Sequence, residues 1–273
     1  MSMDLLFLPQ GNRVIVTAGA SGIGRAIADL LIAQKARVHI CDIDDEALAE
    51  FRKTHPTHGA TKADVSKETD VETLFAEAGK TLGGLDALVN NAGIAGPTGR
   101  VEYLSLTDWT RTIEICLTGQ FLCARKAVPF IKAAGGGSIV NMSSAAGRFG
   151  YAFRTPYAAA KWGVIGFTQS LAKELGPDNI RVNAILPGIV EGPRMTNVIK
   201  ARAEQTGVSY QEMEKTYLDR VSMRRMVSAH DVAGTVLFLL SNAGRHISGQ
   251  SLGVDGNVET CLLYTSPSPR DKR

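Results

Sequence analysis

Tyr157 and Lys161 are separated by three alanines, a spacing that places both side chains on one face of a predicted helix. The reference pKa of tyrosine is about 10, so a tyrosine that exchanges protons near neutral pH needs a cation beside it. The Lys161 ammonium would favour the phenolate. Ser144 follows a predicted strand, and its hydroxyl could orient a substrate oxygen next to Tyr157. Ser143 is the neighbouring alternative for that role.

A second motif is a glycine-rich turn near the N-terminus. Residues 14–17 form a β-branched run that leads through Gly19, Gly22 and Gly24 into an amphipathic helix. Glycines let the backbone approach a pyrophosphate closely, and the first amides of the helix point towards it. A tight strand-to-helix turn without a ligand is the alternative interpretation, because such a turn is a weak signal by itself.

Short apolar runs alternate with helical patterns along the chain, which indicates a parallel sheet with helices on both faces. We expect strands at 13–17, 37–41, 59–63, 85–90, 138–142, 180–185 and 250–254. Helices are expected at 22–33, 43–52, 67–82, 106–133, 156–174 and 229–240. The stretch 189–227 is polar, charged and poorly periodic, and we expect it to form a mobile lid over a substrate. The sequence therefore predicts a single α/β domain over residues 1–260.

Composition limits the class of protein. A chain of 273 residues with 44% hydrophobic content can bury one large core. No apolar run approaches the roughly 18 residues of a membrane span, and the first ten residues lack a signal-peptide pattern. We therefore expect a cytoplasmic protein without a membrane partner. The cysteines and histidines show no metal-ligand spacing, which predicts reduced thiols and no metal.

Residues 261–273 have no periodicity and resemble the translation of a sequencing adapter joined to an assembled metagenomic gene. We expect this tail to be non-native. It contains Arg270, Lys272 and Arg273 against a single acidic residue, Asp271, and so accounts for most of the net charge of +3. Because most of the positive charge lies in this tail, the basic net charge of the chain does not indicate a nucleic-acid partner, and we expect none.

Together these motifs resemble the short-chain dehydrogenase/reductase family, over residues 11–258. The glycine turn, the Asn90-Asn91-Ala92-Gly93 segment, Ser144, the Tyr157–Lys161 pair and Pro187-Gly188 follow the family's order. The resemblance implies a Rossmann-type doubly wound sheet of seven parallel strands in the order 3-2-1-4-5-6-7. It implies Tyr157 as acid and base, Lys161 as the residue that tunes it and binds ribose, and Ser144 as the residue that orients the substrate. A homotetramer or homodimer is also implied.

The resemblance implies a nicotinamide dinucleotide as cofactor. Asp42 ends the second predicted strand, where a carboxylate can accept hydrogen bonds from ribose hydroxyls and would repel a 2′-phosphate. Relatives that prefer NADP usually carry a basic residue where this chain has Ser21 or Ile43, so we expect NAD rather than NADP. The residues implied to hold the cofactor are Ala18, Gly19, Ser21, Gly22, Ile23, Gly24, Asp42, Asp64, Val65, Asn91, Gly93, Tyr157, Lys161, Pro187, Gly188 and Ile189.

Four positions depart from the family's pattern. Ala18 replaces a glycine, so we expect its backbone to avoid positive φ or Gly19 to absorb that geometry. Cys116 replaces an asparagine of the long central helix, which predicts some loss of the local helix distortion and slower proton transfer. Lys35 and Asn257 also replace glycines. We expect a modest stability cost at Lys35, whereas asparagine best tolerates the left-handed region.

The implied substrate is a small secondary alcohol or ketone, and sugars, polyols, hydroxy acids and simple ketones remain open. A 3-oxoacyl thioester reductase using NADPH and a non-catalytic nucleotide sensor are the alternatives. Arg148, Arg154 and the arginines in or near the lid (Arg194, Arg202, Arg220, Arg224 and Arg225) would permit an anionic substrate, although solvated arginines or subunit contacts fit equally well. The expected pocket walls are residues of the covering lid together with Ala95, Ala145, Phe149, Tyr151, Phe153 and Gly188.

Overall fold

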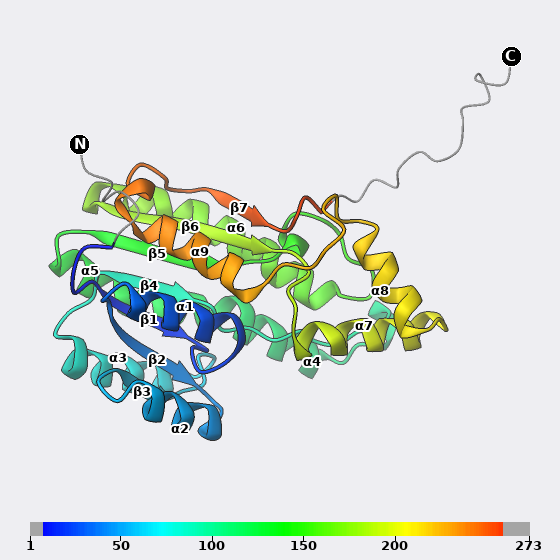
Figure 1. Cartoon of the computed structure of the whole chain (residues 1–273), viewed down its shortest axis with the longest axis horizontal. Coiled ribbons are helices and arrows are strands. Elements are labelled where there is room, and N and C mark those ends of the chain that lie inside the picture. The colour runs from blue at the N-terminus through cyan, green and yellow to red at the C-terminus, as the bar shows by residue number, and fades with distance from the viewer. Residues whose placement is uncertain (1–7, 259–273) are drawn as a thin grey trace, which may run out of the picture.

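The computed structural model describes residues 8–258, which build one seven-stranded parallel sheet with helices on both faces (Figure 1). The strand order is β3-β2-β1-β4-β5-β6-β7, and every pair is parallel. The predicted α/β fold class and strand order are confirmed. The strands are β1 (Arg13–Thr17), β2 (Arg37–Asp42), β3 (Gly59–Lys62), β4 (Ala87–Asn90), β5 (Gly137–Met142), β6 (Ile180–Pro187) and β7 (Ser251–Val254).

Two hydrophobic cores lie on opposite faces of the sheet. Ile15 and Val16 are consecutive in β1 and belong to different cores, because successive strand residues point to opposite faces. This explains the continuous apolar run at 14–16, which is typical of a strand buried on both sides. One core is covered by α1 (Gly22–Ala33), α2 (Asp45–Thr54) and α9 (Ala229–Leu240), and the other by α3 (Glu68–Leu82), α5 (Gly119–Ala133) and α6 (Thr155–Leu175).

The predicted long helix at 106–133 is interrupted. The chain forms α4 (Leu106–Ile113), then a π-helical turn, η3 (Glu114–Thr118), and then α5. The expected loss of the distortion at Cys116 is therefore wrong. The buried Cys116 thiol lies 3.4 Å from the Ile94 amide nitrogen and 3.5 Å from the Ile94 carbonyl oxygen. The thiol thus ties the widened turn to the segment after β4.

The lid is more regular than expected. Residues 189–227 contain α7 (Pro193–Thr206) and α8 (Tyr210–Leu218), which lie beyond the carboxyl ends of the strands (Figure 1). Ile199, Ala203 and Met213 form the small core between these helices, too narrow an apolar stripe to give a clear helical period. Ser209 caps α8 in a reciprocal capping box with Glu212.

Within residues 8–258, no helix is long and apolar enough to cross a membrane. The same part of the chain holds no group of three His, Cys, Asp or Glu side chains that could bind a metal ion. Cys41, Cys116 and Cys123 are buried free thiols. Cys261 and the suspected adapter tail at 261–273 lie outside the described residues.

Candidate active site

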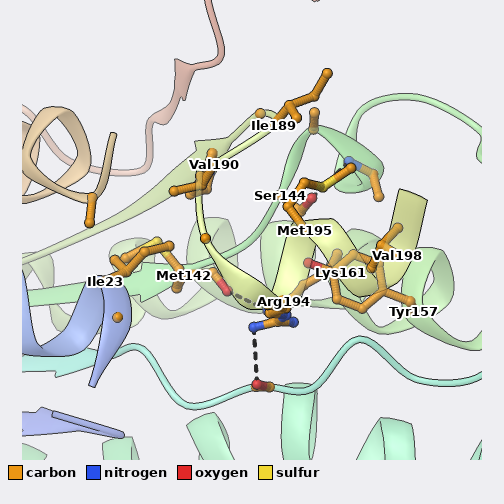
Figure 2. Close-up of a pocket in the computed structure, with 18 of the residues that line it drawn as sticks. Ile23, Met142, Ser144, Tyr157, Lys161, Ile189, Val190, Arg194, Met195 and Val198 are labelled. Atoms are coloured by element: carbon orange, nitrogen blue, oxygen red, sulfur yellow. Dashed lines mark hydrogen bonds between the residues drawn. The ribbon is translucent and has the colours of Figure 1, made fainter. Parts of the chain in front are cut away.

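A cavity of about 570 Å³ opens at the carboxyl ends of β1, β4, β5 and β6, where the lid meets the sheet (Figure 2). It brings together twelve of the predicted site residues: Ala18, Ser21, Gly22, Ile23, Asn91, Gly93, Ser144, Tyr157, Lys161, Pro187, Gly188 and Ile189. Gly19, Gly24, Asp42, Asp64 and Val65 are not part of its lining. The segments that carry these residues lie far apart in sequence, and the parallel sheet aligns their ends at one edge.

Tyr157 and Lys161 enter the cavity from the first two turns of α6. Pro156 stands at the start of this helix, where its fixed φ and missing N–H are tolerated. The Lys161 nitrogen lies 5.6 Å from the centre of the Tyr157 ring. It donates a hydrogen bond of 2.8 Å to the Met142 carbonyl, and Lys161 is only 3% exposed. The ammonium is therefore held in place near the phenol by the end of β5.

The charges around Tyr157 shift its ionisation. Burial by itself would raise the pKa of Tyr157, but the positive charges of Lys161 and Arg194 and a hydrogen bond with Ser144 outweigh that effect. The net result is a lowered pKa for the Tyr157 phenol. A cavity group whose pKa is moved towards neutrality by nearby cations is a candidate for proton exchange.

The two neighbouring serines after β5 do different things. The buried Ser143 hydroxyl donates a 2.8 Å hydrogen bond to the Lys161 carbonyl and so fixes α6 against β5. Ser144 accepts a 3.2 Å hydrogen bond from the Ala146 amide, and its side chain also interacts with Tyr157. Ser144 is thus the serine whose hydroxyl is available beside the phenol.

Ala18 itself adopts positive φ, at 48°, which corrects the expectation that it would avoid this region or that Gly19 would absorb it. The Asn91 side chain explains how the strained backbone is held. Its amide nitrogen donates to the carbonyls of Thr17 and Ala18 at 3.0 and 3.1 Å. The end of β4 therefore fixes the turn after β1.

Two glycines of the turn lie where neighbouring atoms leave no room for a side chain. A Cβ built on Gly24 would lie 1.9 Å from the Ala18 carbonyl oxygen, and one on Gly19 would lie 2.6 Å from the Ile40 side chain. Ser21 precedes α1, and its side chain makes no capping hydrogen bond. The first amides of α1 have no partner within the helix, and Gly22 and Ile23 of this first turn line the cavity. This cradle fits a pyrophosphate, which would accept hydrogen bonds from those amides.

Asp42 is an acidic residue that contacts this glycine-rich turn. It ends β2 and is 9% exposed, and its carboxylate accepts hydrogen bonds from the Ala20 amide at 3.2 Å and the Ile43 amide at 2.8 Å. Its negative charge therefore stands directly beside the glycine turn. The geometry suits a pair of sugar hydroxyls and opposes a phosphate at the same place.

Asp64 and Val65 lie further out. The Asp64 carboxylate forms an ion pair of 2.8 Å with Arg111 and accepts two hydrogen bonds from Ser66. Val65 is buried against the position where Gly119 lacks a side chain. Both residues therefore have structural contacts of their own, which explains why neither lines the cavity.

The expected pocket walls need correction. Ala145, Tyr151 and Gly188 line the cavity, but Ala95, Phe149 and Phe153 do not. Phe149 packs in a small cluster with Ile189. Phe153 takes φ 66°, and its ring lies against the Arg202 guanidinium, 4.1 Å from its central carbon. The arginines that reach the cavity lining are Arg154 and Arg194.

Other lining residues have no individual prediction, and most of them belong to the lid, which was expected to form part of the wall as a group. Met142 could have been found, because it directly precedes the two serines at the end of β5. The lid residues carry no local signal, since only the packing of α7 and α8 turns their side chains inward (Figure 2). The lining residues without an individual prediction are Met142, Ala146, Val190, Glu191, Gly192, Pro193, Met195, Val198, Tyr217 and Ala229, while Ser143, the alternative to Ser144, also lines the cavity.

Comparison with known proteins gives consistent matches over nearly the whole described chain. A family model described as enoyl-(acyl carrier protein) reductase matches residues 17–258. Trans-4-hydroxycyclohexanecarboxylate dehydrogenase of Sinomonas cyclohexanicum is 39% identical, over 89% of this chain and 90% of the relative. A 3-oxoacyl-(acyl-carrier-protein) reductase of Thermotoga maritima is 35% identical, over 91% and 98%. The crystal structure of levodione reductase has a TM-score of 0.84 and 32% identity, over 90% and 97%.

Proposed function

The chain belongs to the short-chain dehydrogenase/reductase family and is a CH–OH oxidoreductase; from that premise we propose that it interconverts a secondary alcohol and a ketone with NAD(H). The observation that carries this proposal is the Tyr157 phenol, which lies in the cavity together with Ser144 and has the Lys161 ammonium beside it. The names of two similar proteins refer to a hydroxycyclohexanecarboxylate and to levodione. They support a cyclic secondary alcohol as the substrate.

The chain's own residues supply binding and proton transfer. In alcohol oxidation the Tyr157 phenolate accepts the hydroxyl proton of the substrate, and Ser144 donates a hydrogen bond to the same oxygen. Lys161 favours the phenolate through its charge. A bound nicotinamide would supply the acceptor for the hydride that leaves the carbinol carbon. In ketone reduction the Tyr157 hydroxyl returns the proton to the oxygen.

The cofactor is assigned to the cradle described above. The amides of α1 near Gly22 and Gly24 would hold the pyrophosphate, and Asp42 would accept hydrogen bonds from the adenosine ribose. Asp64 and Val65 would border the adenine, while Asn91, Gly93 and Lys161 would face the second ribose. Pro187, Gly188 and Ile189 would face the nicotinamide. The charge of Asp42 favours NAD over NADP, which argues against the second candidate, an NADPH-dependent 3-oxoacyl thioester reductase like the Thermotoga relative.

The test measures nicotinamide absorbance with NAD⁺ and NADP⁺ in parallel against cyclic alcohols, polyols and hydroxy acids. Tyr157→Phe is expected to lower kcat by about 10²- to 10⁴-fold, because it removes the acid and base, while NADH binding stays within twofold. Tyr103→Phe is the matched control, since Tyr103 is 80% exposed and outside the cavity.

Three results would contradict the proposal. A Tyr157→Phe enzyme within tenfold of the normal kcat would remove the phenol from the mechanism. A preference for NADP⁺ would overturn the role of Asp42. A protein that binds NADH but turns over no alcohol or ketone would favour the nucleotide sensor.

A further inference from the structure

Arg154 lies directly before α6, one helical turn from Tyr157. Its side chain lines the cavity, and the central carbon of its guanidinium lies 4.8 Å from the centre of the Tyr157 ring. One terminal nitrogen donates a 2.6 Å hydrogen bond to the Ala95 carbonyl. The guanidinium is therefore held in one orientation beside the residue proposed to exchange the substrate proton.

The charge of Arg154 is poorly compensated. Its Nε is shielded from solvent and has no hydrogen-bond partner, and no ion pair within residues 8–258 includes Arg154. Burial lowers the pKa of this guanidinium. Arg181, another partly buried arginine, differs from Arg154 in that it donates hydrogen bonds to two carbonyls, those of Leu239 and Gly244. The positive charge of Arg154 is therefore balanced by no described carboxylate, and an anionic group on a ligand in the cavity would compensate it.

A second cation faces the same space from the lid. Arg194, in the first turn of α7, donates a 3.2 Å hydrogen bond to the Gly93 carbonyl (Figure 2). No described carboxylate pairs with Arg194 either, across residues 8–258. Met195 and Val198 of the same helix give the cavity an apolar wall. The cavity therefore combines an apolar wall suited to a carbon ring with two guanidinium groups, and the acidic residue of its lining, Glu191, is exposed and forms no ion pair with either arginine.

We propose that Arg154, assisted by Arg194, binds a carboxylate on the substrate and so makes the enzyme selective for anionic cyclic alcohols. This inference rests on the proposed function, because it places the reacting hydroxyl at Tyr157 and Ser144. The planar guanidinium matches a carboxylate through two parallel N–H donors. Because Arg154 directly precedes α6 and Tyr157 lies in the first turn of that helix, one small ring can contact both side chains. Arg154 is thus assigned as a residue that determines substrate specificity.

Arg154 has a competing role to exclude. Its guanidinium faces the Tyr157 ring, so it could act on the phenol instead of on the substrate. A residue that acts on the phenol changes the pH profile of kcat for every substrate. A residue that holds a carboxylate changes KM for charged substrates alone.

The kinetic test compares trans-4-hydroxycyclohexanecarboxylate with its methyl ester, which keeps the ring and hydroxyl and removes the charge. Arg154→Gln is expected to raise KM for the acid about 10- to 100-fold, the size of a lost charge-assisted pair, and to leave KM for the ester within twofold. Arg154→Lys should restore part of the loss. Arg148→Gln is the control, because Arg148 is an exposed neighbour outside the cavity. Equal KM changes for acid and ester, or a shifted pH profile of kcat with both, would overturn the proposal.

A binding measurement separates this inference from the proposed function. Cyclohexanecarboxylate, which has no hydroxyl to oxidise, is titrated into the full chain with and without NADH by calorimetry. We expect binding to the wild type that weakens at least tenfold in Arg154→Gln and persists in Arg148→Gln. This result would support the carboxylate site even if no alcohol were turned over. Equal affinity, or no binding to the wild type, would refute the site even if uncharged alcohols were oxidised.

Discussion

Because His39 is buried, we expect the free energy of unfolding to fall in mild acid, and this fall can be measured without knowing the substrate. The ring is 1% exposed in β2, and its two nitrogens lie 2.7 Å from the Thr81 hydroxyl and 2.8 Å from the Thr61 hydroxyl. Thr61 in turn donates a hydrogen bond to Glu77. Burial lowers the pKa of His39 from 6.5 to about 4, although the charge of Glu77 acts in the opposite direction. The folded protein therefore keeps this imidazole neutral.

The size of the effect follows from the difference between folded and unfolded pKa. Above pH 6.5 the ring is neutral in both states, so its stabilising contribution is fully present. Between pH 6.5 and about 4 the unfolded chain binds a proton that the folded chain does not. The free energy of unfolding then falls by about 1.4 kcal/mol per pH unit, or about 2 kcal/mol at pH 5. Below about pH 4 this group causes no further loss.

His39→Gln is the perturbation, because glutamine can donate and accept hydrogen bonds but does not titrate. Thermal unfolding of the wild type and the variant is compared at pH 7 and pH 5. About 2 kcal/mol corresponds to a fall in Tm of about 4–8 °C for a chain of this size, and the wild type should show this fall in excess of the variant. Other acid-sensitive groups are shared by both proteins and cancel in the difference. An equal fall in both proteins would refute a buried neutral His39.

Two further predictions concern positions where this chain departs from the family's pattern. Lys35 takes φ 63°, a left-handed conformation that costs a lysine free energy. Lys35→Gly should therefore raise the free energy of unfolding by about 1 kcal/mol and the Tm by about 2–4 °C. An unchanged or lower Tm would show that the left-handed lysine is not strained. Cys116→Asn should replace the weak thiol contacts with Ile94 by two amide hydrogen bonds. This change should stabilise the π-helical turn by about 1 kcal/mol and raise kcat. An unchanged or lower kcat in steady-state assays would contradict this prediction.

The sequence predicted what depends on local spacing and on strand ends. Tyr157 and Lys161 share a face because the helix repeat places them there, and Ser144 joins them because β5 ends beside α6. The π-helical turn at Cys116 escaped detection, since one widened turn barely changes the apolar spacing of a long helix. The expectation that Phe153 lines the pocket is wrong, because this residue takes a positive φ and its ring packs against Arg202. Such placements depend on tertiary contacts that no local pattern encodes.

Two physical constraints act on the turn after β1, namely the backbone conformation at Ala18 and the close approach of the helix at Gly24. Ala18 sits at φ 48°, a conformation that costs a non-glycine residue free energy, and the fold tolerates it because Asn91 binds its carbonyl. At Gly24 no hydrogen bond could compensate for a side chain, since any Cβ there would overlap the Ala18 carbonyl oxygen. Backbone strain at one residue can be offset by a neighbouring hydrogen bond, whereas an overlap of atoms would separate α1 from β1. Close approach of the helix to the strand is therefore the stricter constraint on this turn, and it explains why the chain keeps Gly24 while Ala18 departs from the family's pattern.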